Sequence, residues 1–187
     1  MLARLEYAGK LLPEASVTSA FPIFSASTVV GSFPSELEDR LDEFLRAERY
    51  YVHQLGTLDI LRASLEANSA IGGDDLSAIF GCFGPLLEFH RHHLARLEQI
   101  RIWTSSLDAW VSALNLEEEA FSIHETYALN IRRAFTVALE RFDNIFDAAM
   151  PPKVYPIHKR RGLLLSALAE PIVHIGVYES VLNVCQS

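Results

Sequence analysis

Cysteine is scarce in this sequence: its 187 residues include only Cys82 and Cys185, far apart and without CxxC spacing. A secreted domain of this size usually carries several more, so a disulfide framework and a cysteine-rich metal site are both excluded. We expect two free thiols in a reducing compartment, which predicts a cytoplasmic protein.

Long apolar runs and excess positive charge are lacking too. The first residues have no apolar stretch behind a basic one, so we expect no secretory signal there. The most apolar region, residues 162–178, is interrupted by Glu170, Pro171 and His174 and cannot cross a bilayer. Sixteen Lys and Arg against 24 Asp and Glu give a net charge of -8, the opposite of what a phosphate backbone attracts. We therefore expect no membrane span and no nucleic-acid partner.

Sequence motifs for covalent chemistry are missing as well, since the chain has no GxGxxG, HExxH or GxSxG run. The densest histidine group is His90–His93. His90 and His93 share a helix face, and Glu88 lies four residues before His92, so a zinc-binding pair is geometrically possible. A closed zinc site needs two further ligands, which no local spacing supplies. We predict no cofactor, no metal and no enzymatic bond making.

The hydrophobic pattern predicts helices. Half of the residues are apolar (50%), enough for a core, and from Ser35 they recur every three or four positions to about Ser69. Ser35 with Glu38 has the spacing of a capping box at the start of this helix. Residues 1–34, rich in Pro, Ser and Thr, are predicted to form an N-terminal arm, and residues 35–187 the domain.

Breaks at glycine and proline divide the remainder of the chain. They predict further helices over residues 74–80, 85–103 and 117–150, and two final helices, 159–169 and 172–184, separated by Pro171. No strand alternation is visible. The predicted fold class is therefore all-α, an elongated helical bundle.

One carboxylate stands on an apolar stripe. Glu48 lies between Leu45 and Val52, where an apolar residue is expected, and a carboxylate buried without a partner is costly. Two interpretations stay open: Glu48 pairs with a nearby Arg of the chain, or it faces a partner protein.

A basic run, residues 153–161, stands out in a chain that is acidic overall. It contains Lys153, Lys159, Arg160 and Arg161. One interpretation is that this run is the solvated start of a helix. The alternatives are a surface that binds an acidic partner, or one that binds anionic lipid headgroups and so associates peripherally with a membrane.

Several of these segments together resemble the Dbl-homology (RhoGEF) domain family. Arg46–Leu55 is similar to its first conserved region, and Ile79–Gly81 followed by Leu86–Glu98 to its second. The run Ala120–Asn130 resembles a later aromatic segment, most closely that of fungal cell-polarity exchange factors. Residues 153–165 resemble the third region, with its Lys and triple Leu but without its Gln-Arg pair. The final helix is expected to be shorter than in the family.

This resemblance implies an exchange factor that binds the switch regions of a Rho, Rac or Cdc42-type GTPase and promotes GDP release. Glu48 would accept hydrogen bonds from switch I, and Lys153 and Asn183 would approach switch II. The other implied contact residues are Arg49, Tyr51, Arg160 and Arg161. The alternative is a non-catalytic interaction module on the same scaffold. A Glu48 enclosed by the chain's own residues would refute its role as a partner contact.

Overall fold

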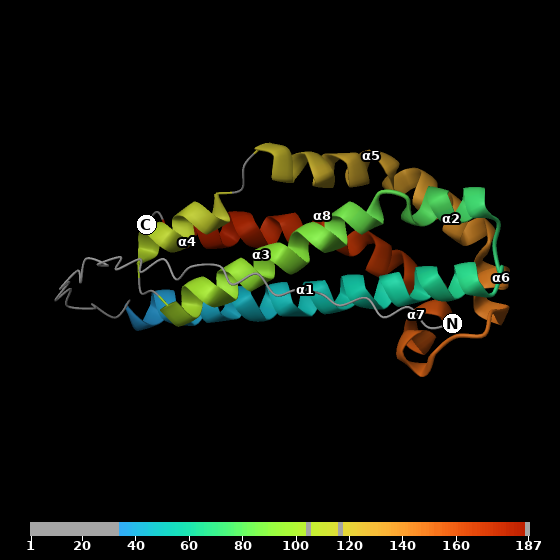
Figure 1. Ribbon diagram of the computed structural model, residues 1–187, viewed down its shortest axis with the longest axis horizontal. Helices are drawn as coiled ribbons and strands as arrows, with labels where there is room; N and C mark the ends of the chain where they lie inside the picture. Colours follow the sequence, from blue (N-terminus) through green and yellow to red (C-terminus); the bar gives the residue numbers. More distant parts are fainter. Residues whose placement is uncertain (1–33, 104–105, 116–117, 186–187) are drawn as a thin grey trace, which may run out of the picture. The chain divides into compact units, whose positions relative to one another are not determined.

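The computed structural model describes residues 34–103, 106–115 and 118–185, and every regular element within these ranges is a helix. The predicted arm, residues 1–34, lies outside the described residues except for Pro34. The described helices belong to one compact unit, residues 31–187. The prediction of an all-α bundle is confirmed for the described part of the chain (Figure 1).

The longest helix, α1 (Ser35–Ala67), agrees closely with the predicted one. The elements after it are α2 (Gly73–Phe80), α3 (Phe83–Trp103), α4 (Leu107–Leu114), α5 (Glu118–Glu140), α6 (Phe142–Asp147), the 3-10 turn η1 (Pro152–Val154), α7 (Tyr155–His158) and α8 (Arg161–Cys185). The predicted helix over residues 117–150 is thus divided at Arg141.

The start of α1 differs from the predicted capping box. Pro34 precedes the helix, Ser35 is its first residue, and no side chain caps it. Glu38 points to α3 instead, where its carboxylate accepts a hydrogen bond from Arg101 at 2.9 Å. Arg101 also donates to Asp42 from its Nε at 2.7 Å, so this guanidinium links α1 to α3.

Helix α8 is continuous, whereas the sequence predicted a break at Pro171. A proline inside a helix removes one backbone hydrogen bond and crowds the preceding turn, which often ends the helix. Here Pro171 is buried, and α8 packs against α1 on one side and α5 on another. Packing along both sides holds the helix together across the missing bond.

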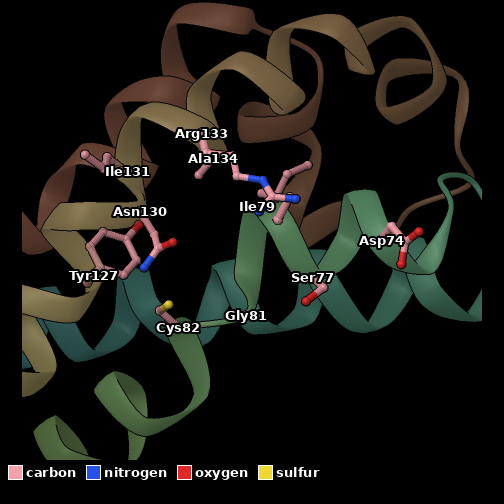
Figure 2. A pocket seen from close by; sticks show the side chains of 11 residues that line it. Asp74, Ser77, Ile79, Gly81, Cys82, Tyr127, Asn130, Ile131, Arg133 and Ala134 are labelled. Carbon is pink, nitrogen blue, oxygen red and sulfur yellow. The ribbon is translucent and has the colours of Figure 1, made fainter.

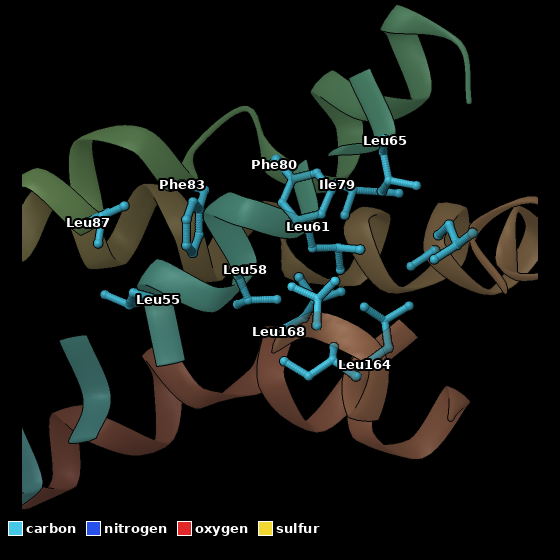
Figure 3. Close-up of a cluster of buried hydrophobic side chains, with 14 of the residues drawn as sticks. Leu55, Leu58, Leu61, Leu65, Ile79, Phe80, Phe83, Leu87, Leu164 and Leu168 are labelled. Atoms are coloured by element: carbon cyan, nitrogen blue, oxygen red, sulfur yellow. The ribbon is translucent and has the colours of Figure 1, made fainter. Parts of the chain in front are cut away.

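Two apolar clusters fill the bundle. The first joins the C-terminal half of α1 to α2, to the start of α3 and to the N-terminal half of α8 (Figure 3), and it includes residues of α5 as well. The second joins the N-terminal half of α1 to α4 and to the C-terminal ends of α3 and α8. Along α1, Leu45 belongs to the second cluster and Tyr51 to the first. Glu48 lies between them, at the level where the apolar core is interrupted.

Candidate functional site

Buried side chains with polar groups gather where the two apolar clusters meet. They come from α1, α3, α5 and α8, and each is at most 5% exposed. We call this set the polar layer; its members are Glu48, Tyr51, His90, His93, His124, His174 and Tyr178. Each lies on the buried stripe of its own helix, so the local helical period places all of them inside.

Glu48 is the acceptor at the centre of the polar layer. His90 donates from Nδ1 to Oε1 at 2.7 Å, and His174 donates from Nε2 to Oε2 at 2.6 Å. The Tyr178 hydroxyl donates to Oε2 at 3.0 Å. Three donors from α3 and α8 thus satisfy a carboxylate on α1, as a buried charge requires.

The hydrogen bonds continue from α3 to α5. His90 Nε2 lies 2.9 Å from His124 Nε2, and only one proton fits between the two nitrogens. When His90 is neutral and donates from Nδ1 to Glu48, its Nε2 accepts from His124. In this arrangement the proton of His124 is on Nε2, as is the proton that His174 donates to Glu48.

Burial and hydrogen bonding act on the ionisation of this layer in opposite directions. Burial alone would raise the pKa of Glu48, but hydrogen bonds from His174 and His90, together with the charge these rings carry when protonated, lower it to about 2. Burial lowers the pKa of both His93 and His124 to about 4. At neutral pH the layer thus holds an ionised Glu48 and a neutral His93 and His124.

Aromatic rings fix the histidines in place. The Tyr51 ring stacks on His174 with centroids 3.8 Å apart and an interplanar angle of 21°. It meets His90 edge-on at 4.6 Å. Tyr178 in turn packs edge-on against Phe44 at 5.2 Å. Tyr51 is therefore part of the packing that orients the donors of Glu48.

These positions correct two predicted partner contacts. Glu48 and Tyr51 are both 0% exposed, so neither side chain is available to a partner in this structure. The prediction that Glu48 faces a partner is wrong here, because residues of α3 and α8 enclose it. The interpretation that it pairs with an Arg is also wrong, since its partners are two histidines and a tyrosine.

The predicted basic contacts lie on different flanks. Arg49 donates to Glu98 of α3 at 2.7 Å. Arg161 donates to Asp143 of α6 at 3.3 Å, and its guanidinium lies 4.9 Å from the centroid of the Phe142 ring. These two arginines are therefore engaged within the chain.

The other three predicted contact residues are exposed. Lys153 and Arg160 flank the short α7, at the N-terminal end of α8. Asn183 lies near the opposite end of α8, which at 1.5 Å per residue is about 30 Å along the helix. The structure therefore does not gather the predicted contact residues into one patch.

A groove that the sequence analysis missed runs between α1 and α8. It has a volume of about 280 Å³, and its lining residues are Tyr50, Gln54, Pro156, Ile157, Leu163, Ser166, Ala167 and Glu170. Tyr50 is 60% exposed and Leu163 41% exposed. Tyr50 could have indicated this groove from the sequence, because it is an aromatic residue on the polar face of a predicted amphipathic helix.

A second hollow lies between α2 and α5 (Figure 2). It has a volume of about 450 Å³, and Figure 2 shows Cys82, Tyr127 and Arg133 around it. It shares no lining residue with the groove between α1 and α8. These two concave surfaces are therefore separate, and the groove between α1 and α8 is the one that includes residues of α7, beside Lys153 and Arg160.

The donor atoms of Glu48, His90 and His174 all lie within 4.8 Å of one another, so these three residues form a group able to hold a metal ion. The pair that the sequence suggested, Glu88 and His92, is exposed with its atoms 3.5 Å apart. Ligand-type residues therefore come together across helices rather than along one.

Comparison with known proteins identifies one family. The family described as RhoGEF domain matches residues 41–184, which extend from α1 through almost all of α8. The comparison with curated proteins finds no match, and neither does the comparison with solved structures. Within the described ranges no helix has both the length and the apolar character needed to cross a membrane.

Proposed function

Because the chain belongs to the RhoGEF domain family, we propose that it binds a small GTPase of the Rho family and accelerates the release of its GDP. RhoGEF domains are exchange factors and make no covalent bond. The observation that carries the proposal is the extent of the match, which covers the helices around both apolar clusters rather than one short motif.

An exchange factor acts by preferring one state of its partner. It binds the nucleotide-free GTPase more tightly than the GDP-bound form, and by reciprocity the GTPase then holds GDP less tightly. The switch loops of a GTPase are held by phosphate and magnesium contacts, so a protein that holds these loops elsewhere expels both. The chain must therefore have an accessible surface that binds these loops.

We place that surface on the groove between α1 and α8. Tyr50 and Leu163 offer exposed apolar area, and aromatic anchors commonly dominate protein interfaces. Glu170 also lines the groove and gives it a carboxylate acceptor, the group that the family resemblance assigned to Glu48. Lys153 and Arg160 flank the α7 segment of the groove and are proposed as its charged rim.

Three further contact predictions lie outside this surface. Arg49, Arg161 and Asn183 stay predictions of the family resemblance, as does a role in fungal cell polarity. The proposed location is the cytoplasm, where Rho-type GTPases act on the inner face of membranes.

A GDP-release assay with matched variants tests the groove. Leu163→Glu places a charge in the groove and is expected to slow GDP release at least tenfold, which corresponds to about 1.4 kcal/mol. Leu139→Glu is the control, since Leu139 lies on α5 and is 43% exposed, close to the 41% of Leu163. Release should be followed for Rho, Rac and Cdc42-type GTPases, with helicity checked by circular dichroism. Equal effects of the two variants would refute the groove as the contact surface.

A non-catalytic interaction module is the second candidate. The enclosure of Glu48 favours it, because the carboxylate that the family resemblance assigns to switch I is not accessible here. The missing Gln-Arg pair points the same way. A module binds the GTPase without accelerating GDP release, so a pull-down that is positive beside a release assay that is negative identifies it.

A further inference from the structure

The polar layer holds a buried negative charge without a permanent positive charge bound to it. The side chains that hydrogen-bond to Glu48 are two imidazoles and a phenol. A metal ion at this place would neutralise the buried carboxylate directly.

The donor atoms around Glu48 are of the types that zinc binds. Two histidine nitrogens and a carboxylate are ligands found in three-residue zinc sites. They come from α3, α8 and α1, and all three side chains are at most 3% exposed. We propose that Glu48, His90 and His174 bind one Zn²⁺ ion, which ties these three helices together.

Binding of one ion requires the three side chains to rearrange. Glu48 Oε1 lies 2.7 Å from His90 Nδ1 and Glu48 Oε2 lies 2.6 Å from His174 Nε2, which are hydrogen-bonding distances, and all the ligand atoms lie within 4.8 Å of one another. Zinc–nitrogen bonds of about 2.0 Å in a tetrahedron place neighbouring ligand atoms about 3.3 Å apart. Each hydrogen-bonded pair must therefore open by about 0.6 Å, and both imidazoles must turn toward the same ion.

The surroundings supply what zinc ligands usually have. A ligating histidine commonly donates its second ring N–H to another group, and His90 Nε2 lies 2.9 Å from His124 Nε2. When Nδ1 of His90 binds zinc, Nε2 carries the proton and His124 accepts it. The Tyr178 hydroxyl donates to Glu48 Oε2 at 3.0 Å and so holds the carboxylate in place beside the site.

Such an ion would be structural, since buried ligands from separate helices couple metal binding to folding. The proposal is independent of GTPase binding and does not depend on exchange activity. Its ligands lie 42 and 84 positions apart in the sequence (Glu48 to His90, and His90 to His174), so no local motif could announce it.

Metal analysis of the full chain tests the site. The protein is purified after expression with added zinc, dialysed, and analysed by elemental mass spectrometry, with about one zinc ion per chain expected. A chelator should lower the melting temperature and added Zn²⁺ should restore it. Co²⁺ in place of Zn²⁺ should give the intense visible absorption of a tetrahedral site. A zinc-free wild type whose melting temperature ignores both chelator and zinc overturns the proposal.

A conservative variant separates a zinc ligand from a hydrogen-bond donor. His174→Gln keeps an N–H that can donate to Glu48 but removes the imidazole ligand. Loss of a group that only hydrogen-bonds to a ligand already lowers metal affinity about tenfold, so loss of a ligand should lower zinc affinity at least about tenfold. His92→Gln is the control, because His92 lies on α3 and is exposed. Equal zinc affinity in both variants also overturns the proposal. If His174→Gln does not fold, the cobalt spectrum and thermal shift of the wild type decide the question alone.

Discussion

Removal of the Glu48 carboxylate tests the conclusion that this residue is structural. Glu48→Ala leaves the donors on His90, His174 and Tyr178 buried without their acceptor. Each such group costs about 1–3 kcal/mol, and loss of one partner from a buried ionic network costs about 3–5 kcal/mol. We expect the free energy of unfolding to fall by about 3–5 kcal/mol, a large part of the about 5–15 kcal/mol that holds a domain.

The measurement is urea unfolding followed by circular dichroism, with thermal melting beside it. For a chain of this size a loss of 1 kcal/mol lowers the melting temperature by about 2–4 °C. Glu43→Ala is the matched control, because Glu43 lies on the same helix with a side chain that is 65% exposed. An exposed salt bridge contributes little, so this control should stay within about 0.5 kcal/mol of the wild type.

The same variant separates structure from partner contact. At a temperature where Glu48→Ala remains folded, its GDP release should stay within about twofold of the wild type, since the side chain touches no partner in the proposed groove. The reasoning is refuted if the variant keeps its full stability and yet loses GDP release. That result would mean that Glu48 is accessible and contacts the GTPase.

Two further perturbations follow from the charges of the bundle. Acidification should destabilise the fold in two steps. The pKa values of His93 and His124 are lowered to about 4 in the folded state, so between about pH 6.5 and 4 the unfolded chain binds more protons and is favoured. Below about pH 4.5 the unfolded chain also protonates Glu48, whose pKa in the folded state is about 2, and stability falls further. Urea unfolding at pH 7, 5.5 and 4 should show a steady decline, and a free energy of unfolding that does not change over this range would contradict the assigned protonation states. Arg101→Ala removes the ion pairs that link α3 to Asp42 and Glu38 of α1. Because the Arg101 side chain is 35% exposed, we expect the free energy of unfolding to fall by only about 1 kcal/mol. A fall of more than about 3 kcal/mol would show that these ion pairs are less solvated than described.

Individual helices could be predicted well because the signals that make them are local. The apolar period of α1 and the glycines around α2 fixed where these helices begin and end within a few residues. Pro171 misled the analysis for the opposite reason: a proline predicts a break, and only packing of α8 between α1 and α5 shows that the helix continues. Local propensity is a weak guide where tertiary contacts hold an element in place.

The candidate site divides in the same way. The sequence alone predicted an all-α domain that resembles the RhoGEF family, and it marked Glu48 as an unusual residue, because helical period and motif order depend on neighbouring positions. Only the tertiary structure decided that Glu48 points into the core, since its donors His90 and His174 come from other helices far along the chain. Burial is a property of the assembled bundle, and the side of a helix that faces a partner is known only when the other helices have taken their places.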